Sequence, residues 1–510
     1  MIIMFKSFIF VSFITCLSRF LGFVRDAVVA YVFGVSIETD AFYIAFKLPN
    51  LLRRIFADGG VSQVLVPILY KYKSDKNKEE IKIFLSSILG LFFFILLFIV
   101  FLGIINSSII ISFFLPGYSC DIHKLYLAKI LFSIMFPYII FISISSLYGL
   151  VLNTWNKYTI SSFIPILLNI SMIFFSLFII KYFNHPIIGL AWSVLFGGCL
   201  QFLYPLPFLK KLGLLVFPYF NFRNIKIYHI FYKIIPMMIV TFISQISVFI
   251  NTILSSYFTT GSVSWIYYAE RLVEFPSGVL GVSISSILLP SLSRSFFIKD
   301  YKKCSSLIDW GLRLCFLLAL PATVALIILS GPIILILFQY GKFTAFDSLM
   351  TQHILLAYSF GLLGFITVKI LSTSFYSFQN IVVPIKISFI ILVLSQFMNF
   401  LFVYFFEYIG IALSTSFSGL INAFLLYYEL RKKNIFTPNP GWFIFLFRIF
   451  FSVFVMASVL FICMYFMPSW EIGNFFYKIF RLFLLCFIGL ITYLIMLFLL
   501  KLRISDFTRY

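Results

Sequence analysis

Charged residues are scarce in this chain, and acidic ones are the scarcest. Only 11% of its 510 residues are charged, with 17 Asp and Glu against 38 Lys and Arg, while 62% are hydrophobic. Soluble globular proteins are roughly 45–50% apolar, so this composition excludes an ordinary soluble protein. A membrane-spanning helix needs about 20 apolar residues. We therefore predict an all-α polytopic membrane protein that lacks a sizeable soluble domain.

Residues that usually carry catalysis or bind metals are also few. The chain has no HExxH pair, no aspartate-rich motif of the kind that holds Mg²⁺ and diphosphate, and no P-loop. Its seven cysteines are scattered without metal-ligand spacing, and its four histidines are dispersed. These absences argue against a metal site, a disulfide framework, a cofactor and ATP hydrolysis. A transporter driven by membrane potential or an ion gradient fits better than an enzyme.

The net charge of +21 reports topology rather than binding to nucleic acid. Apolar segments predict about fourteen spans, centred near residues 20, 55, 95, 140, 170, 197, 242, 280, 318, 360, 392, 420, 455 and 488. If the N-terminus is cytoplasmic, the inside loops hold most of the loop cations, whereas the outside loops hold only Lys124, Lys181 and Lys342. Cytoplasmic loops carry an excess of Lys and Arg, so both termini are predicted to be cytoplasmic.

A weak internal repeat suggests how the spans are grouped. The segment Ser62–Leu69 ends the second predicted span, and the similar segment Ser285–Leu292 ends the eighth, each before a basic loop. An offset of six spans relates the two copies by an axis along the membrane normal. We predict an N-terminal lobe over 1–215, a C-terminal lobe over 216–435, and an accessory pair of helices over 436–510.

Arginines interrupt the apolar sequence where a span should have none. Arg19 and Arg53 each lie about thirteen residues into a span, from opposite sides, which places both near mid-bilayer. A charge there costs roughly 2.5–3.5 kcal/mol if it faces lipid. Together with Arg25 and with Arg271 of the eighth span, they predict a cationic central cavity for an anionic ligand, because guanidinium groups bind phosphate bidentately.

An alternative explanation for these arginines is internal pairing with carboxylates. Arg25 could pair with Asp26 or Asp40, Arg53 with Asp58, and Arg271 with Glu274. Further side chains lie in the same segments and are predicted to support the cavity: Ser18, Asp26, Lys47, Asn50, Arg54, Asp58 and Glu274.

Asp40 and Ser264 lie at the outer ends of the second and eighth predicted spans. The repeat makes these two ends symmetry mates, which favours a periplasmic gate that opens and closes. The alternative is that both residues are ordinary helix N-caps.

The segments that carry these residues resemble the MurJ (MviN) family of lipid II flippases. The resemblance covers essentially the whole chain, and its most specific parts are LPNLLRRIFA at 48–57 and GSVSWIYYAERLVEFPSGVLGV at 261–282. The family belongs to the multidrug/oligosaccharidyl-lipid/polysaccharide exporter superfamily.

The resemblance implies fourteen spans, with two six-helix lobes around a central cavity and a final pair that forms a groove for the lipid tail. It also implies that lipid II moves from the cytoplasmic to the periplasmic leaflet of the bacterial inner membrane by alternating access. The family's essential cavity arginines fall on Arg19, Arg25, Arg53 and Arg271, where they would bind the lipid's pyrophosphate. Some members are associated with a sodium site; the seventh and eleventh spans here contain no Asp or Glu, so we expect no such site.

The expected partners are therefore lipid II, membrane phospholipid and the peptidoglycan synthesis machinery. Three other functions stay open at this point. The chain could export another lipid-linked oligosaccharide or small molecules, it could be a membrane enzyme acting on polyprenyl phosphates, or it could be a scaffold for cell-wall synthesis.

Overall fold

The structure, a computed structural model, describes residues 2–56, 65, 68–69, 73, 78–118, 122–219, 225–378, 380 and 382–502. Over these residues it contains helices and no strands, and a helix covers every predicted span centre except residue 360, which lies in the short break between two helices. Nine described segments are long and apolar enough to cross a membrane, or ten if the bent pair α15 (Ala345–Ser359) and α16 (Leu362–Ser377) forms one span. The all-helical membrane fold is confirmed, and the number fourteen stays a prediction.

Helices are expected in a membrane because the bilayer offers no water to hydrogen-bond backbone N–H and C=O groups, and a helix pairs these groups internally. The helix α4 (Lys78–Ile105) illustrates the pattern: its charged residues lie in its first turns, and the rest is apolar. Its glutamates at the N-terminal end also complement the helix dipole.

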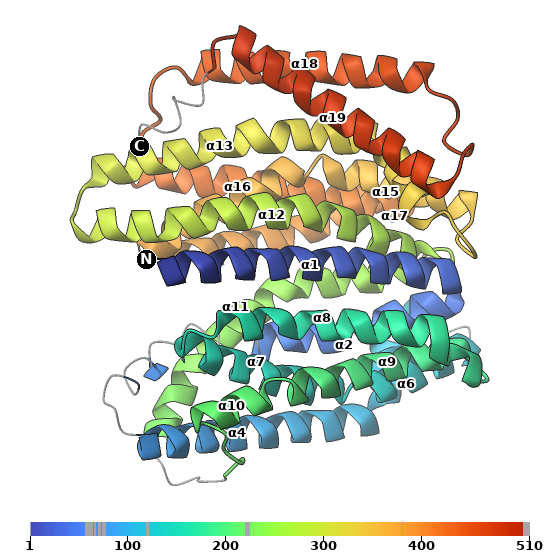
Figure 1. Cartoon of the computed structure of the whole chain (residues 1–510), viewed down its shortest axis with the longest axis vertical. Helices are drawn as coiled ribbons and strands as arrows, with labels where there is room; N and C mark the ends of the chain where they lie inside the picture. The colour runs from blue at the N-terminus through green and yellow to red at the C-terminus, as the bar shows by residue number, and fades with distance from the viewer. Residues whose placement is uncertain are drawn as a thin grey trace. The chain divides into compact units, whose positions relative to one another are not determined.

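The first compact unit runs from Met1 to Ser264. Within it α1 packs along α8, α8 along α9, and α2 along α6 and α7. Besides α4, the described helices of this unit are α1 (Ile2–Phe33), α2 (Ile37–Phe56), α5 (Ser107–Phe114), η1 (Pro116–Tyr118), α6 (Ile122–Met135), α7 (Tyr138–Thr154), α8 (Tyr158–Phe174), η2 (Phe175–Ile179), η3 (Ile180–Tyr182), α9 (Pro186–Leu203), α10 (Leu206–Leu212) and α11 (Ile225–Ser255), most of them labelled in Figure 1.

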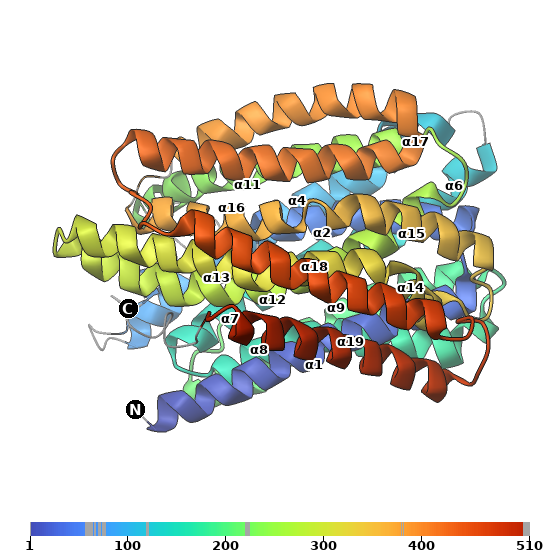
Figure 2. The same ribbon diagram turned by 90° about the horizontal axis from the view of Figure 1, so that it is seen from above.

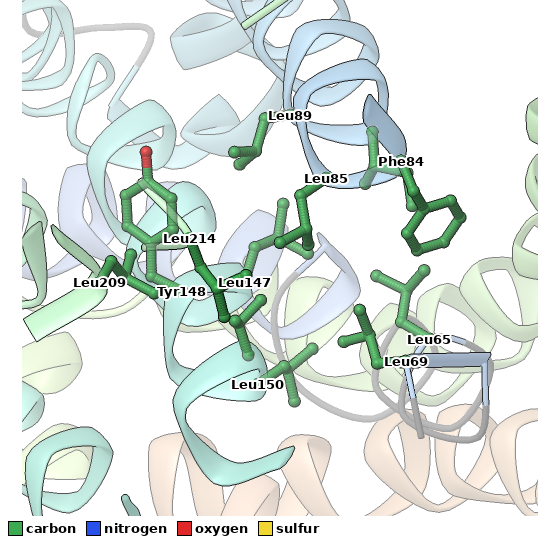
Figure 3. A pocket seen from close by; sticks show the side chains of 12 residues that line it. Leu65, Leu69, Phe84, Leu85, Leu89, Leu147, Tyr148, Leu150, Leu209 and Leu214 are labelled. Carbon is green, nitrogen blue, oxygen red and sulfur yellow. The ribbon is translucent and has the colours of Figure 1, made fainter. Parts of the chain in front are cut away.

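An apolar pocket lies between α4, α7 and α10 of this unit (Figure 3). Leucines from these helices line it, and the Tyr148 side chain is its polar member. The pocket has no charged side chain in its lining, so it does not provide the anion-binding chemistry that the arginines predict.

The second unit runs from Trp265 to Tyr510. The helix α12 (Ser262–Phe297) begins at the end of the first unit and continues into the second. The remaining helices are α13 (Tyr301–Ile328), α14 (Ser330–Phe338), α15, α16, α17 (Val382–Lys432), α18 (Trp442–Phe466) and α19 (Phe475–Leu499).

The long element α17 contains two of the predicted spans. Its backbone leaves the helical region at Glu407, where φ is 48° and ψ is −130°. Two arms run back alongside each other from this turn (Figure 2). One of them meets α16 at Gly364, where a Cβ would lie 2.7 Å from the backbone nitrogen of Leu420, so glycine permits close helix packing.

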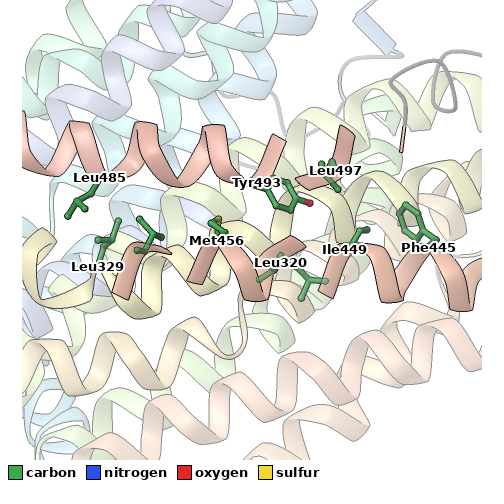
Figure 4. Close-up of a cluster of buried hydrophobic side chains, with 10 residues drawn as sticks. Leu320, Leu329, Phe445, Ile449, Met456, Leu485, Tyr493 and Leu497 are labelled. Atoms are coloured by element: carbon green, nitrogen blue, oxygen red, sulfur yellow. The ribbon is translucent and has the colours of Figure 1, made fainter. Parts of the chain in front are cut away.

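The helices α18 and α19 cross and pack against α13 and α14 through a buried apolar cluster (Figure 4). Ile449 and Leu485 are fully buried within it. At the start of α18, the buried Asp309 of α13 accepts hydrogen bonds from Trp442 Nε1 at 2.6 Å, Asn439 N at 3.1 Å and Arg313 Nε at 2.8 Å. These bonds fix the start of α18 to α13. The predicted lobes 1–215, 216–435 and 436–510 stay a prediction.

Candidate functional site

Arg25 lies in a buried polar cluster between α1 and α8. Its Nη2 and Nε donate to Asp26 Oδ1 at 2.7 and 2.9 Å, and its Nη1 donates to Asn169 Oδ1 at 3.1 Å. Arg25 and Asp26 are 6% and 3% exposed. The charge of this predicted cavity arginine is therefore balanced by its neighbour, as the pairing alternative expects.

Arg19 lies less than two turns before Arg25 on the same helix, and its environment differs. Its side chain is partly exposed. Among the described residues it has no hydrogen bond and no ion pair. The preceding Ser18 is held in place, since its carbonyl accepts a hydrogen bond from Asn169 Nδ2 at 3.1 Å. Arg19 thus offers a full guanidinium to a ligand.

The predicted supporting cations of α2 contact α11 of the same unit. Lys47 Nζ donates to Thr252 Oγ1 at 3.3 Å, and Arg54 Nη1 donates to Gln245 Oε1 at 3.4 Å. Both acceptors are neutral, so these two contacts orient the cations.

Arg53 also has a neutral contact, since its Nε donates to Asn50 Oδ1 at 2.9 Å within α2. Asp58, the predicted partner of Arg53, lies outside the described residues, as does most of the repeat segment 62–69.

Asp40 and Ser264 meet at the N-terminal end of α12. Asp40 Oδ1 accepts hydrogen bonds from Ser264 N at 2.9 Å and Ser264 Oγ at 2.6 Å, and its Oδ2 accepts one from Gly261 N at 2.6 Å. The first N–H groups of a helix have no partner within it. Asp40 therefore caps α12 rather than its own helix, and its charge also favours the positive end of the α12 dipole.

Arg271 and Glu274 lie on α12 in the second unit. Arg271 Nη1 lies 2.8 Å from Glu274 Oε2, and the guanidinium stacks over the Tyr267 ring with its carbon 5.1 Å from the centroid. The Glu274 side chain is 47% exposed, which weakens such a pair.

Several polar residues that organise these sites were not predicted from the sequence. Asn169 joins Ser18 to Arg25, and nothing in its apolar surroundings singles it out.

Lys369 of α16 donates to the carbonyl of Ser277 at 3.0 Å. It is a lone cation within an apolar helix, so the insertion-cost argument used for the arginines would have found it. Trp265 donates from Nε1 to Asp347 Oδ1 at 2.9 Å, a contact between distant helices that no local pattern reveals.

Comparison with known proteins agrees with this description. Residues 29–481 match the family model described as lipid II flippase MurJ. The chain is 48% identical to the probable lipid II flippase MurJ of Buchnera aphidicola subsp. Acyrthosiphon pisum, over 98% of each chain. It is 38% identical to the lipid II flippase MurJ of Burkholderia cenocepacia, over 90% of each chain.

Solved structures give the same result. A lipid II flippase MurJ in an inward closed conformation matches with a TM-score of 0.81 and 29% identity, over 96% of this chain and 98% of the other. An inward-facing multidrug MATE transporter of the MOP superfamily, at 13% identity and a TM-score of 0.65 over 82% and 95% of the two chains, shares the fold. The chain is thus a multi-pass transporter of the inner membrane and not an enzyme, and it belongs to the lipid II flippase MurJ family.

Proposed function

We propose that this chain moves lipid II, the undecaprenyl-pyrophosphate-linked peptidoglycan precursor, from the cytoplasmic to the periplasmic leaflet by alternating access. The observation that carries the mechanism is the state of Arg19, which is partly exposed and has no partner among the described residues. A guanidinium within an apolar helix is costly, and the two phosphates of lipid II would supply its missing anion.

The other arginines take different roles in this proposal. Arg25 is neutralised by Asp26 and joins α1 to α8 through its hydrogen bond to Asn169. Arg53 contacts a neutral amide and Arg271 an exposed carboxylate. In this proposal both turn toward pyrophosphate, which arginine binds bidentately.

Asp40 and Ser264 form the periplasmic gate in this proposal. Three hydrogen bonds join Asp40 to Gly261 and Ser264; they would hold the gate closed, and their exchange for water would open it. The lipid tail would lie against α18 and α19, whose outward faces expose large apolar side chains such as Phe454, Phe461 and Phe483.

Both termini are cytoplasmic in this proposal, as the loop cations predict. The driver is membrane potential or an ion gradient, since each charge moved through 100 mV is worth about 2.3 kcal/mol. Membrane phospholipid and the peptidoglycan synthesis machinery are the further proposed partners.

The test replaces one arginine in cells whose own flippase is depleted. Arg19→Gln should insert and accumulate like the wild type but fail to expose lipid II at the periplasmic face. Arg294→Gln is the matched control, because Arg294 is an exposed cation on α12. Normal export by Arg19→Gln would refute the role of Arg19.

A further inference from the structure

Two cations lie on one face of α19, near its start, and both are buried. Lys478 and Arg481 are 8% and 4% exposed, and residues three apart on a helix are neighbours on its surface. The connection from α18 to α19 covers Arg481, whose guanidinium carbon lies 4.3 Å from the Trp470 ring centroid and 5.5 Å from that of Tyr477. Lys478 Nζ lies 5.9 Å from the ring centroid of Tyr340, in the connection between α14 and α15.

The hydrogen-bonding capacity of this group is incompletely used. Arg481 donates through Nη2 and Nη1 to the carbonyls of Pro468 and Ser469, but its Nε is buried without a partner. The buried Tyr340 hydroxyl also has no partner. The Lys478 side chain has no hydrogen bond or ion pair with any described residue.

Carboxylates do not balance these charges. The acid nearest in sequence, Glu471, is exposed, and within the described part of the chain neither cation lies in salt-bridge distance of a carboxylate. A buried charge without a counter-ion costs several kcal/mol, and the aromatic rings repay only part of that cost. Three unpartnered donors, Lys478 Nζ, Arg481 Nε and the Tyr340 hydroxyl, and two positive charges are the chemistry of an anion site.

The surroundings indicate which anion fits. On the same helix Phe476 and Phe480 are 82% and 62% exposed, and in the adjoining connection Ile472 is 62% exposed. In a membrane protein such apolar surface meets lipid, and Trp and Tyr mark the level of the headgroups. Burial raises the pKa of the Tyr340 phenol, which keeps it a neutral donor.

We propose that Lys478, Arg481 and Tyr340 bind the phosphate of a lipid headgroup at the α18–α19 connection. The phosphate would accept hydrogen bonds from Lys478 Nζ and the Tyr340 hydroxyl and would neutralise Arg481. A membrane phospholipid and a polyprenyl phosphate share this chemistry. The site involves none of the arginines proposed to hold the transported pyrophosphate, so it stands apart from the proposed function.

The test measures lipid binding to the purified full-length protein by native mass spectrometry and by thermal stabilisation. The probes are phosphatidylglycerol, undecaprenyl phosphate and inorganic phosphate, each added separately. Lys478→Gln removes one charge and leaves the loop contacts of Arg481 in place, so the fold should persist. Lys342→Gln is the matched control, because this exposed lysine lies two residues from Tyr340.

We expect Lys478→Gln to weaken binding of at least one phosphate lipid by about tenfold, and Lys478→Arg to restore it, while Lys342→Gln binds as the wild type does. The lipid that loses affinity identifies which source fills the site. Equal binding of both lipids by the wild type and Lys478→Gln would overturn the proposal. Stabilisation by inorganic phosphate as large as by either lipid would overturn its assignment to a lipid headgroup.

Discussion

Replacing Asp40 by alanine tests the proposed gate. Asp40 is fully buried, and its carboxylate accepts from two backbone N–H groups and one hydroxyl at the start of α12. Asp40→Ala leaves all three donors without an acceptor, while Ser264→Ala removes only the hydroxyl. The two variants therefore weaken the same contact to different extents.

The magnitude follows from the number and kind of bonds lost. A hydrogen bond to a charged group contributes about 1.5–3 kcal/mol, and a buried donor left unsatisfied costs about 1–3 kcal/mol. We expect Asp40→Ala to destabilise the closed arrangement by about 3–5 kcal/mol and Ser264→Ala by about 1–2 kcal/mol. Because 1.4 kcal/mol is tenfold in an equilibrium constant, Asp40→Ala should increase the open population by roughly a hundredfold or more.

The assay is cysteine labelling from outside the cell. In a chain whose native cysteines are replaced by serine, Val263→Cys places a thiol at a position that is 1% exposed. A membrane-impermeant maleimide should label it slowly in the closed arrangement and much faster with Asp40→Ala. Glu38→Ala is the control, because Glu38 is an acid in the same turn of α2 whose side chain makes no hydrogen bond with a described residue. Equal labelling rates in Asp40→Ala and the control would refute this account of the gate.

Three further predictions concern stability, measured as thermal unfolding of the purified protein. Arg25→Gln should destabilise by about 3–5 kcal/mol because it leaves Asp26 buried without its partner, and adding Asp26→Asn should recover part of the loss. Asp309→Ala should cost a similar amount by releasing α18 from α13, and an unchanged melting temperature would contradict that role. Gly364→Ala should cost about 1–3 kcal/mol through its clash with the α17 backbone, and wild-type stability would show that α16 and α17 separate freely.

Much of the fold could be predicted because the bilayer leaves few choices. Apolar length fixes where helices occur, and a helix covers each predicted span centre except residue 360, which lies in the break between α15 and α16. The loop cations make an orientation prediction in the same way. The count of spans could not be settled from the sequence pattern alone. Bent or merged helices make the number of helices differ from the number of apolar segments, as in α17, which contains two predicted spans and a turn at Glu407.

Those residues of the candidate site that place a charge within an apolar span could be predicted from the sequence. Insertion cost singled out Arg19 and Arg25, but it could not tell that Arg25 is neutralised by Asp26 while Arg19 is not. That difference depends on side-chain rotamers and on Asn169 from α8. The repeat register placed Asp40 opposite Ser264, and the three hydrogen bonds there show a cap between helices rather than within one.

The central claim is that this chain exports lipid II, and depletion tests it most directly. Cells depleted of their own flippase are complemented with this chain, and the fraction of lipid II exposed to the periplasm is measured by an externally added enzyme. The account predicts that depletion lowers this fraction and that the chain restores it. Restoration of growth with no recovery of periplasm-exposed lipid II, or no change in that fraction on depletion of this protein in its host, would contradict the account.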